Sequence, residues 1–282
     1  MLRDKRFTWR RRYGERHLSL SIASVSLLIL ILLTACSRGG SADLFERGEV
    51  LLGDGDHMEA LELYRSLINK FPESAHAPSA RYRIGTIHYL HTGNLKKALD
   101  AYLSLILLYP ESEEIALARG DMAEIYRRNG EHRKAIGEYQ WLVEHSKSAE
   151  RDAYRYNIAM EYQNLSDFKQ AVIEIEDILK NSPSDKLLPK LYYQLGSNQY
   201  LDGNTEEAMT TYDTVIEEYS NDPLSLEATL GKAVILEEVG QLREAAALLN
   251  SLIETYPNRD AIEVRLKWVK KRTRERASRR RQ

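Results

Sequence analysis

The chain has few of the residues that disulfides and metal sites need. Cys36 is the single cysteine among 282 residues, so it has no partner for an internal disulfide. His88 and His91 stand three residues apart, but no acidic residue is close enough in sequence to complete a metal set. We therefore interpret both histidines as structural, and we expect no metal site and no cofactor.

Motifs for catalysis are also missing. The sequence contains no Gly-rich phosphate loop and no nucleophile elbow. The run Gly53-Asp54-Gly55-Asp56 faintly resembles a calcium loop, but it lacks the remaining acidic ligands and the terminal glutamate. The sequence therefore predicts that the protein is not an enzyme.

Basic residues are scarce in the central part of the chain. Residues 36–262 hold 23 basic and 38 acidic residues, and Lys232 is the only base between Leu191 and Leu242. The net charge of −2 arises because residues 1–35 and 263–282 are strongly basic. An acidic body disfavours contacts with phosphates, so we expect no nucleic-acid partner.

What the chain does have is an internal repeat. Six alanines follow one another at steps of 38, 37, 36, 37 and 37 residues: Ala60, Ala98, Ala135, Ala171, Ala208 and Ala245. A fixed period in the thirties predicts a stack of identical supersecondary units. Such stacks act through an extended binding surface, which favours a protein-binding function over catalysis in a pocket.

Further columns of the repeat predict two helices per unit. Five residues before the alanines stand Gly55, Gly93, Gly130, Ser166, Gly203 and Gly240, where a left-handed residue would end the first helix. The next residue is Asp or Asn in four units (Asp56, Asn94, Asp167 and Asn204), a good N-cap for the second helix. Large apolar or aromatic residues follow four, seven and eight positions after each alanine, which predicts a buried stripe.

These columns resemble the tetratricopeptide repeat family over the stretch from Ala42 to Pro257. The resemblance implies an all-α, right-handed superhelical solenoid of about six helix hairpins. We place the solenoid at residues 43–258, with units at about 43–75, 76–112, 113–148, 149–185, 186–222 and 223–258. Ile262, Leu266 and Val269 form one apolar stripe, which predicts a capping helix over residues 259–272.

The N-terminus has the pattern of an export signal. Residues 1–35 combine seven basic residues with an apolar run from Leu18 to Leu33. The following Leu33-Thr34-Ala35-Cys36 resembles a bacterial lipobox, which implies cleavage and diacylation of Cys36. Ser37 after the cysteine implies sorting to the outer membrane, and residues 36–42 read as a tether on its periplasmic face. The alternative is an uncleaved transmembrane anchor.

The repeats Glu59–Ser74 (EALELYRSLINKFPES) and Lys97–Ser112 (KALDAYLSLILLYPES) are similar to those of the lipoprotein subunit of the outer-membrane β-barrel assembly machinery. That resemblance implies a periplasmic scaffold whose partners are assembly components or unfolded outer-membrane proteins. The sixth repeat and the long basic tail depart from that family. A coordinator of cell-wall synthesis or division, binding a cell-wall enzyme, is the alternative. A third hypothesis is that the protein is an enzyme, but no sequence motif supports it.

The tetratricopeptide resemblance also implies a concave groove, built from the first helix of each unit. Carried onto this chain, its columns give Arg83, His91, Arg127, Arg128, Tyr156, Gln163, Asn164, Tyr193 and Tyr200, with Glu124, Glu237 and Glu238 beside them. We expect a groove that is basic at one end, aromatic and amide-rich in the middle, and acidic at the other. The alternative is that the tyrosines pack between helices.

The chain ends in a basic tail. Residues 273–282 have no apolar stripe, so we expect them to be disordered when free. The acidic repeats, anionic lipid head groups or an acidic protein surface could each bind the tail.

Overall fold

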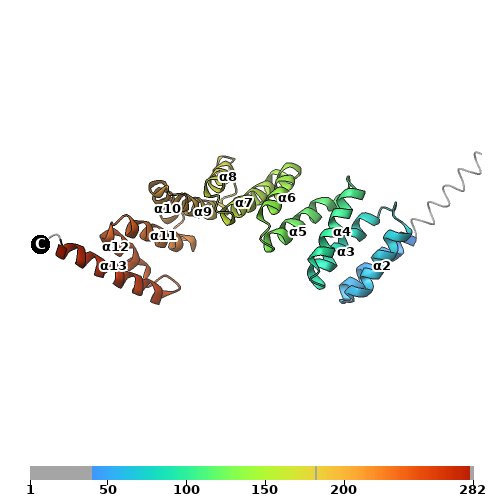
Figure 1. Ribbon diagram of the computed structural model, residues 1–282, viewed down its shortest axis with the longest axis horizontal. Helices are drawn as coiled ribbons and strands as arrows, with labels where there is room; N and C mark the ends of the chain where they lie inside the picture. The colour runs from blue at the N-terminus through green and yellow to red at the C-terminus, as the bar shows by residue number, and fades with distance from the viewer. Residues whose placement is uncertain (1–39, 182, 280–282) are drawn as a thin grey trace, which may run out of the picture. The chain divides into compact units, whose positions relative to one another are not determined.

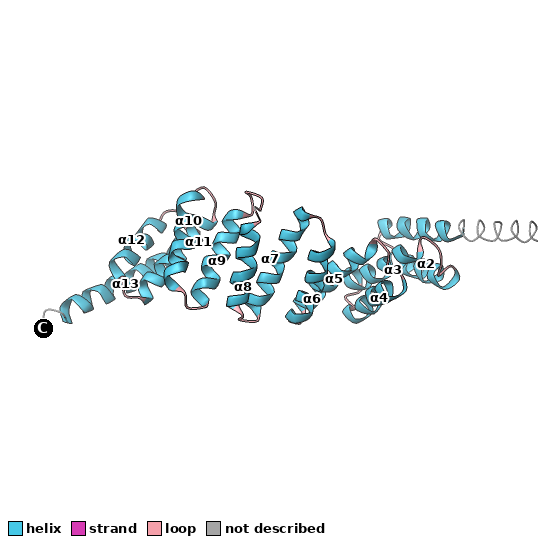
Figure 2. Ribbon diagram, turned by 90° about the horizontal axis from the view of Figure 1, so that it is seen from above, coloured by secondary structure: helices cyan, strands magenta, loops and turns pink. Residues whose placement is uncertain are grey.

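The structure is a computed structural model that describes residues 40–181 and 183–279. Throughout these ranges the chain forms helices and loops, with no strand (Figure 2). No helix in the described part is both long and apolar enough to cross a membrane. The export signal and Cys36 lie outside the described residues.

The chain divides into two compact units, with the boundary between Thr92 and Gly93. The first unit contains a helix described over residues 40–54, α2 (His57–Lys70), α3 (Ala77–Thr86) and the π-helical turn η1 (Ile87–His91).

The second unit contains ten helices in the described ranges, and Figure 1 follows them along the chain. They are α4 (Leu95–Leu108), α5 (Glu114–Arg128), α6 (His132–His145), α7 (Ser148–Asn164), α8 (Phe168–Lys180), α9 (Leu188–Leu201), α10 (Thr205–Glu218), α11 (Leu224–Glu238) and α12 (Leu242–Leu252), followed by a tenth helix, α13 (Arg259–Arg279), at the end of the unit. Within this unit each helix packs against the next one along the chain. The predicted all-α solenoid of helix hairpins is therefore confirmed.

The predicted register of the repeat is confirmed by burial. All six repeat alanines are fully buried in the second helix of their hairpin. The residues four positions later are also buried: Tyr64, Tyr102, Tyr139, Ile175, Tyr212 and Leu249. A small residue and a large one, one turn apart, thus form the same contact stripe in every hairpin.

The turn column has the predicted backbone conformation at all six positions. Each glycine of the column has a positive φ, between +64° and +90°, and Ser166 takes the same conformation at +58°. In the described part of the chain Ser166 is the only residue other than glycine with a positive φ. Such a residue ends one helix and turns the chain into the next.

The predicted N-caps are only half right. Asn94 and Asp167 accept a hydrogen bond from the backbone N–H three residues later, at 3.1 and 3.3 Å. The side chains of Asp56 and Asn204 make no such bond. A side chain of the right type at the turn therefore does not always cap the helix.

Two predicted boundaries are wrong. The expected tether does not extend to residue 42, because the first helix is already formed at residue 40 and Ser41 is buried. At the other end, disorder does not begin at Thr273, because α13 continues to Arg279. Thr273 bonds the carbonyl of Val269 at 2.9 Å, and the Arg272 guanidinium lies 4.5 Å from the ring centre of Trp268, so side chains support the extra turns.

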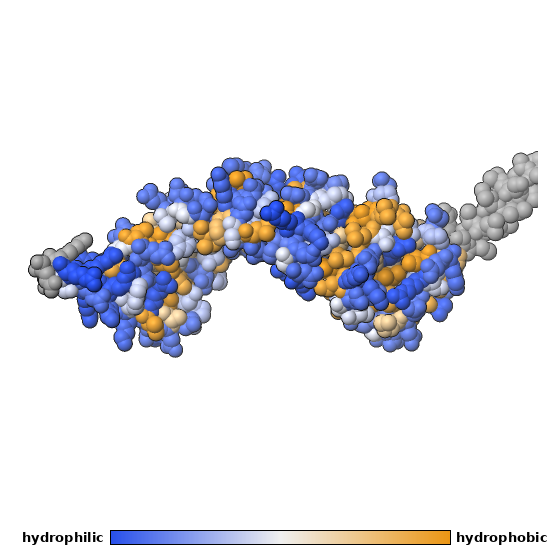
Figure 3. Space-filling model, viewed as in Figure 1, coloured by the Kyte–Doolittle hydropathy of each residue, from blue (hydrophilic) through white to orange (hydrophobic). Residues whose placement is uncertain are grey.

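The face of the molecule drawn in Figure 3 carries many hydrophilic side chains with apolar side chains between them. Leu103 and Leu107 of α4 are 49% and 79% exposed.

The core of the last hairpin includes Ile262, Leu266 and Val269 of α13, which pack on Leu249 and Leu252 of α12. The apolar stripe predicted for the capping helix is therefore buried where it was expected.

Candidate protein-binding surface

In the first unit, Arg83 is held in a structural network. Its Nε and Nη2 donate to the two carboxylate oxygens of Glu49, at 2.8 and 2.7 Å. The hydroxyl of Tyr64, which is fully buried, donates to the same carboxylate at 2.6 Å. Burial and the bond to Glu49 raise the pKa of Tyr64. Arg83 is thus held by hydrogen bonds to a residue of its own unit. The columns of the sequence repeat did not predict these bonds.

His91 lies at the exposed end of η1 in the same unit. Its ring stacks on that of His57, with ring centres 3.5 Å apart. Burial and the neighbouring His57 lower the pKa of His91. In the ranges that the structure describes, no group of three or more His, Cys, Asp or Glu side chains could hold a metal ion.

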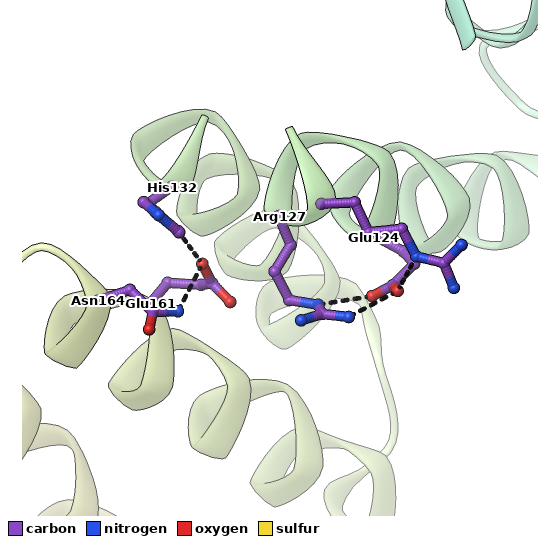
Figure 4. Close-up of polar contacts among 6 residues, drawn as sticks. Glu124, Arg127, His132, Glu161 and Asn164 are labelled. Carbon is purple, nitrogen blue, oxygen red and sulfur yellow. Dashed lines mark hydrogen bonds and ion pairs between the residues drawn. The ribbon is translucent and has the colours of Figure 1, made fainter. Parts of the chain in front are cut away.

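In the second unit, Arg127 and Arg128 share one carboxylate at the end of α5, that of Glu124, which Figure 4 shows beside Arg127. Arg127 donates two hydrogen bonds to Glu124, both at 2.7 Å, and Arg128 Nε donates a third at 2.7 Å. The bond from Arg127 is the main reason why the pKa of Glu124 is lowered. Both guanidinium groups stay about half exposed, so this cluster presents a net positive charge to solvent.

Beside this cluster lies a pair that the sequence analysis did not select. His132 Nδ1 is 2.6 Å from Glu161 Oε2, and the Asn164 amide reaches the same oxygen at 3.5 Å (Figure 4). The Glu161 side chain is only 1% exposed. Glu161 stands ten residues before Ala171, between two of the family's groove columns. The groove columns carried onto this chain therefore did not include it.

Farther along the second unit, side chains of successive first helices contact one another. Asn198 of α9 donates to Gln163 of α7 at 3.4 Å. Tyr200 of α9 donates to Glu238 of α11 at 2.7 Å. Burial, together with that bond, raises the pKa of Tyr200 to about 12. These two bonds thus link α7 to α9 and α9 to α11.

We name these side chains the polar column. It comprises Glu124, Arg127, Arg128, Glu161, Gln163, Asn164, Asn198, Tyr200 and Glu238, all of the second unit. Arg127, Arg128, Asn164 and Glu238 are exposed members. Arg265 of α13 bonds the buried Glu237 at 2.8 Å, so Glu237 is occupied by the capping helix.

Two of the predicted groove tyrosines lie elsewhere. Tyr156 is 8% exposed and packs in a core cluster with Ile175 and Ile178. Tyr193 packs against Tyr212, with ring centres 6.1 Å apart. For these two residues the helix-packing alternative describes their contacts better than the groove does.

Comparisons with known proteins identify the sequence repeat as a tetratricopeptide repeat. Models described as tetratricopeptide repeat match residues 45–113, 153–185, 190–222 and 227–259, together more than half of the chain. No curated protein matches the sequence significantly.

Solved structures share the fold at low identity. A tetratricopeptide repeat protein from Parabacteroides merdae has a TM-score of 0.57 and 20% identity, covering 82% of this chain and 87% of that one. PilF of Pseudomonas aeruginosa has a TM-score of 0.51 and 13% identity, covering 81% and 99%. YrrB, a repeat protein with an unusual peptide-binding site, has a TM-score of 0.54 and 16% identity, covering 72% and 97%. Identities this low show a common fold alone.

Proposed function

The chain belongs to the tetratricopeptide repeat family, and from this premise we propose that it is a scaffold that binds other proteins through the polar column. Repeats of this kind present an extended surface, and their stacked helices provide no catalytic pocket. We therefore propose binding, without catalysis and without a cofactor, as the activity of the chain.

One observation carries the proposal. Residues of α5, α7, α9 and α11 that are separated by about 37 positions in sequence form one row of donors and acceptors, and those of α5, α7 and α11 include exposed side chains. The row begins with Arg127 and Arg128, continues through Asn164, and reaches the carboxylate of Glu238. A partner segment lying along this row would meet a cation, an amide and a carboxylate in order. Arginine and tyrosine are common at binding hot spots.

The cellular setting follows from the sequence pattern at the N-terminus. We propose that Cys36 is diacylated and holds the scaffold on the periplasmic face of the outer membrane. The similarity of Glu59–Ser74 and Lys97–Ser112 to the β-barrel assembly lipoprotein supports a role in outer-membrane protein assembly. The second candidate is a coordinator of cell-wall synthesis or division, supported by the same repeat pattern.

Recovery of partners from the detergent-solubilised envelope tests the proposal. Wild type is compared with Arg127→Glu combined with Arg128→Glu, which reverses the charge at one end of the polar column. We expect the double variant to lose its main partner. A partner carboxylate at this end of the polar column would face two introduced carboxylates beside Glu124 in place of two guanidinium groups. Identification of the lost protein by mass spectrometry then separates an assembly component from a cell-wall enzyme.

Arg243→Glu combined with Lys267→Glu is the matched control, since it makes the same charge change away from the polar column. Circular dichroism checks that all variants are folded. Unchanged recovery with the first double variant, or equal loss with both, would show that the polar column is not the binding surface.

A further inference from the structure

The last helix of the second unit, α13, carries large apolar side chains that remain exposed. Val264 and Trp268 stand four residues apart, about one turn of the helix, and are 70% and 49% exposed. The buried residues Ile262, Leu266 and Val269 pack in the core of the last hairpin instead. The helix therefore has one apolar face that closes the solenoid and a second apolar site that is open to solvent.

Two open hollows adjoin this pair, and Val264 and Trp268 line both of them. One hollow has a volume of about 540 Å³, and its lining includes the apolar residues Leu230, Tyr256 and Ile262. The other has a volume of about 990 Å³ and is lined largely by charged residues of α13. Apolar and charged surfaces thus meet at the exposed tryptophan.

The charge of this surface is mainly positive. Beyond Val264 the helix holds eight Arg or Lys residues and one acidic residue, Glu275. Lys267, Lys270 and Arg274 are exposed, line the larger hollow and form no ion pair with another described residue. Their charges are therefore available to an anion from outside the chain.

We propose that this face of α13 binds the surface of an anionic phospholipid membrane. A helix that lies in a membrane surface buries Trp and aliphatic side chains at the boundary between head groups and acyl chains, while its bases contact the lipid phosphates. Trp is enriched at that boundary because its ring is amphipathic. The helix lies on the membrane and does not cross it, since it is too polar to span the bilayer.

The residue types favour a lipid surface over an acidic protein. Three of the five bases that line the larger hollow are lysines, Lys267, Lys270 and Lys271. Lysine is depleted at protein–protein interfaces, whereas lysine clusters are common where proteins bind anionic lipids. The inference rests on the membrane setting of the proposed function, but it does not depend on what the polar column binds.

Quenching of Trp268 fluorescence by brominated lipids tests the proposal. The full-length protein is reconstituted in vesicles of phosphatidylcholine, with or without phosphatidylglycerol, that carry bromine on the acyl chains near the head groups. The emission that Trp268→Phe removes is assigned to Trp268, because the other tryptophans are present in both proteins. We expect strong quenching of Trp268 in the anionic vesicles and little in phosphatidylcholine alone.

Lys270→Gln combined with Arg274→Gln should weaken this contact. Each base near an anionic surface strengthens binding about fivefold, so the ratio of bound to unbound helix should fall at least about tenfold. The matched control is Lys169→Gln combined with Lys180→Gln, which removes two exposed bases of α8 and should leave the quenching unchanged. Circular dichroism checks that all variants are folded.

Three results would overturn the proposal: no quenching of Trp268 in the anionic vesicles, equal quenching in both kinds of vesicle, or equal loss in the α8 control. Protection of Trp268 from aqueous acrylamide only after other envelope proteins are added would also overturn it, in favour of a protein occupant. Mass spectrometry of the N-terminus reports separately whether Cys36 carries lipid. Failure of the proposed anchor is therefore distinguishable from failure of α13 to bind the membrane surface.

Discussion

Arg276 Nη1 donates a hydrogen bond to the carbonyl oxygen of Gly240, 36 residues earlier, at 3.0 Å. This bond ties the last turns of α13 to the turn of the sixth hairpin. A Cβ on Gly240 would lie 2.6 Å from the same nitrogen, so the two groups are in close contact. The C-terminal turns are therefore part of the folded cap.

Deletion of residues 273–282 should lower the melting temperature of the solenoid. The deletion removes the bond to Gly240, and we expect a loss of about 1 kcal/mol, or a few degrees. Differential scanning calorimetry measures the change. Arg276→Ala should reproduce much of it, whereas Arg274→Ala, whose side chain makes no hydrogen bond to the described residues, should not. An unchanged melting temperature would show that the bond from Arg276 to Gly240 does not stabilise the cap.

Ser166→Gly should stabilise the second unit. Ser166 holds a φ of +58°, which costs a residue with a Cβ roughly 1 kcal/mol, whereas glycine adopts it freely. We therefore expect a gain of about 0.5–1 kcal/mol in urea unfolding. The reverse change, Gly203→Ser, is the control, because space around that Cβ is open and only the φ of +90° opposes it. A loss of stability in Ser166→Gly would show that the Ser166 side chain makes a compensating contact.

The parts of the fold that could be predicted are those that recur in every hairpin. The Ala98 column and the Gly93 column appear six times, so helix faces and turns could be placed even where Ser166 replaces glycine. The resemblance then selected Arg127 and Tyr200 for the groove, and their part in binding stays a prediction. Periodic positions carry this information because each repeat buries the same apolar face against its neighbours.

The polar contacts could not be predicted, because each occurs once and joins distant residues. Arg83 bonds Glu49 from 34 positions away, and His132 meets Glu161 from 29 positions away. Such pairs depend on how neighbouring hairpins pack, which no column shows. The contacts of Tyr156 were hidden for the same reason: its column faces the groove in the family, and here the ring is mostly buried beneath the ammonium of Lys190.

Arg83→Gln should destabilise the first unit. The substitution leaves Glu49 partly buried with only the Tyr64 bond, so we expect a loss of about 1–2 kcal/mol. Glu49→Gln combined with Arg83→Gln should cost less than the sum of the two single changes, since neither charge is then left alone. Hydrogen exchange of α2 and α3 measures the loss locally. Strict additivity of the two changes would contradict a direct ion pair.

Stability of the second unit should fall in acid partly through Glu124. Its pKa is lowered in the folded state by Arg127, so its contribution is complete above the unfolded pKa and is lost as pH falls through the folded value. The group is partly exposed, so we expect the contribution to be at most about 1 kcal/mol. Urea unfolding from pH 7 to pH 3 should show a shallower decline in Glu124→Gln than in wild type. Parallel curves would exclude this contribution.

Cys36→Ser should block lipidation and processing of the N-terminus. Burial of each acyl CH₂ contributes about 0.8 kcal/mol, so two chains anchor a protein stably, whereas loss of both leaves no lipid attachment. The serine variant cannot be acylated, and the lipoprotein peptidase cleaves only acylated precursors, so we expect an unprocessed form of higher mass. Globomycin should cause the wild-type precursor to accumulate in the same form. If globomycin left wild-type processing unchanged, Cys36 would not be the lipidated residue and the uncleaved-anchor alternative would be favoured. Mass spectrometry of the mature N-terminus distinguishes the two outcomes, because only the lipoprotein begins with a modified cysteine.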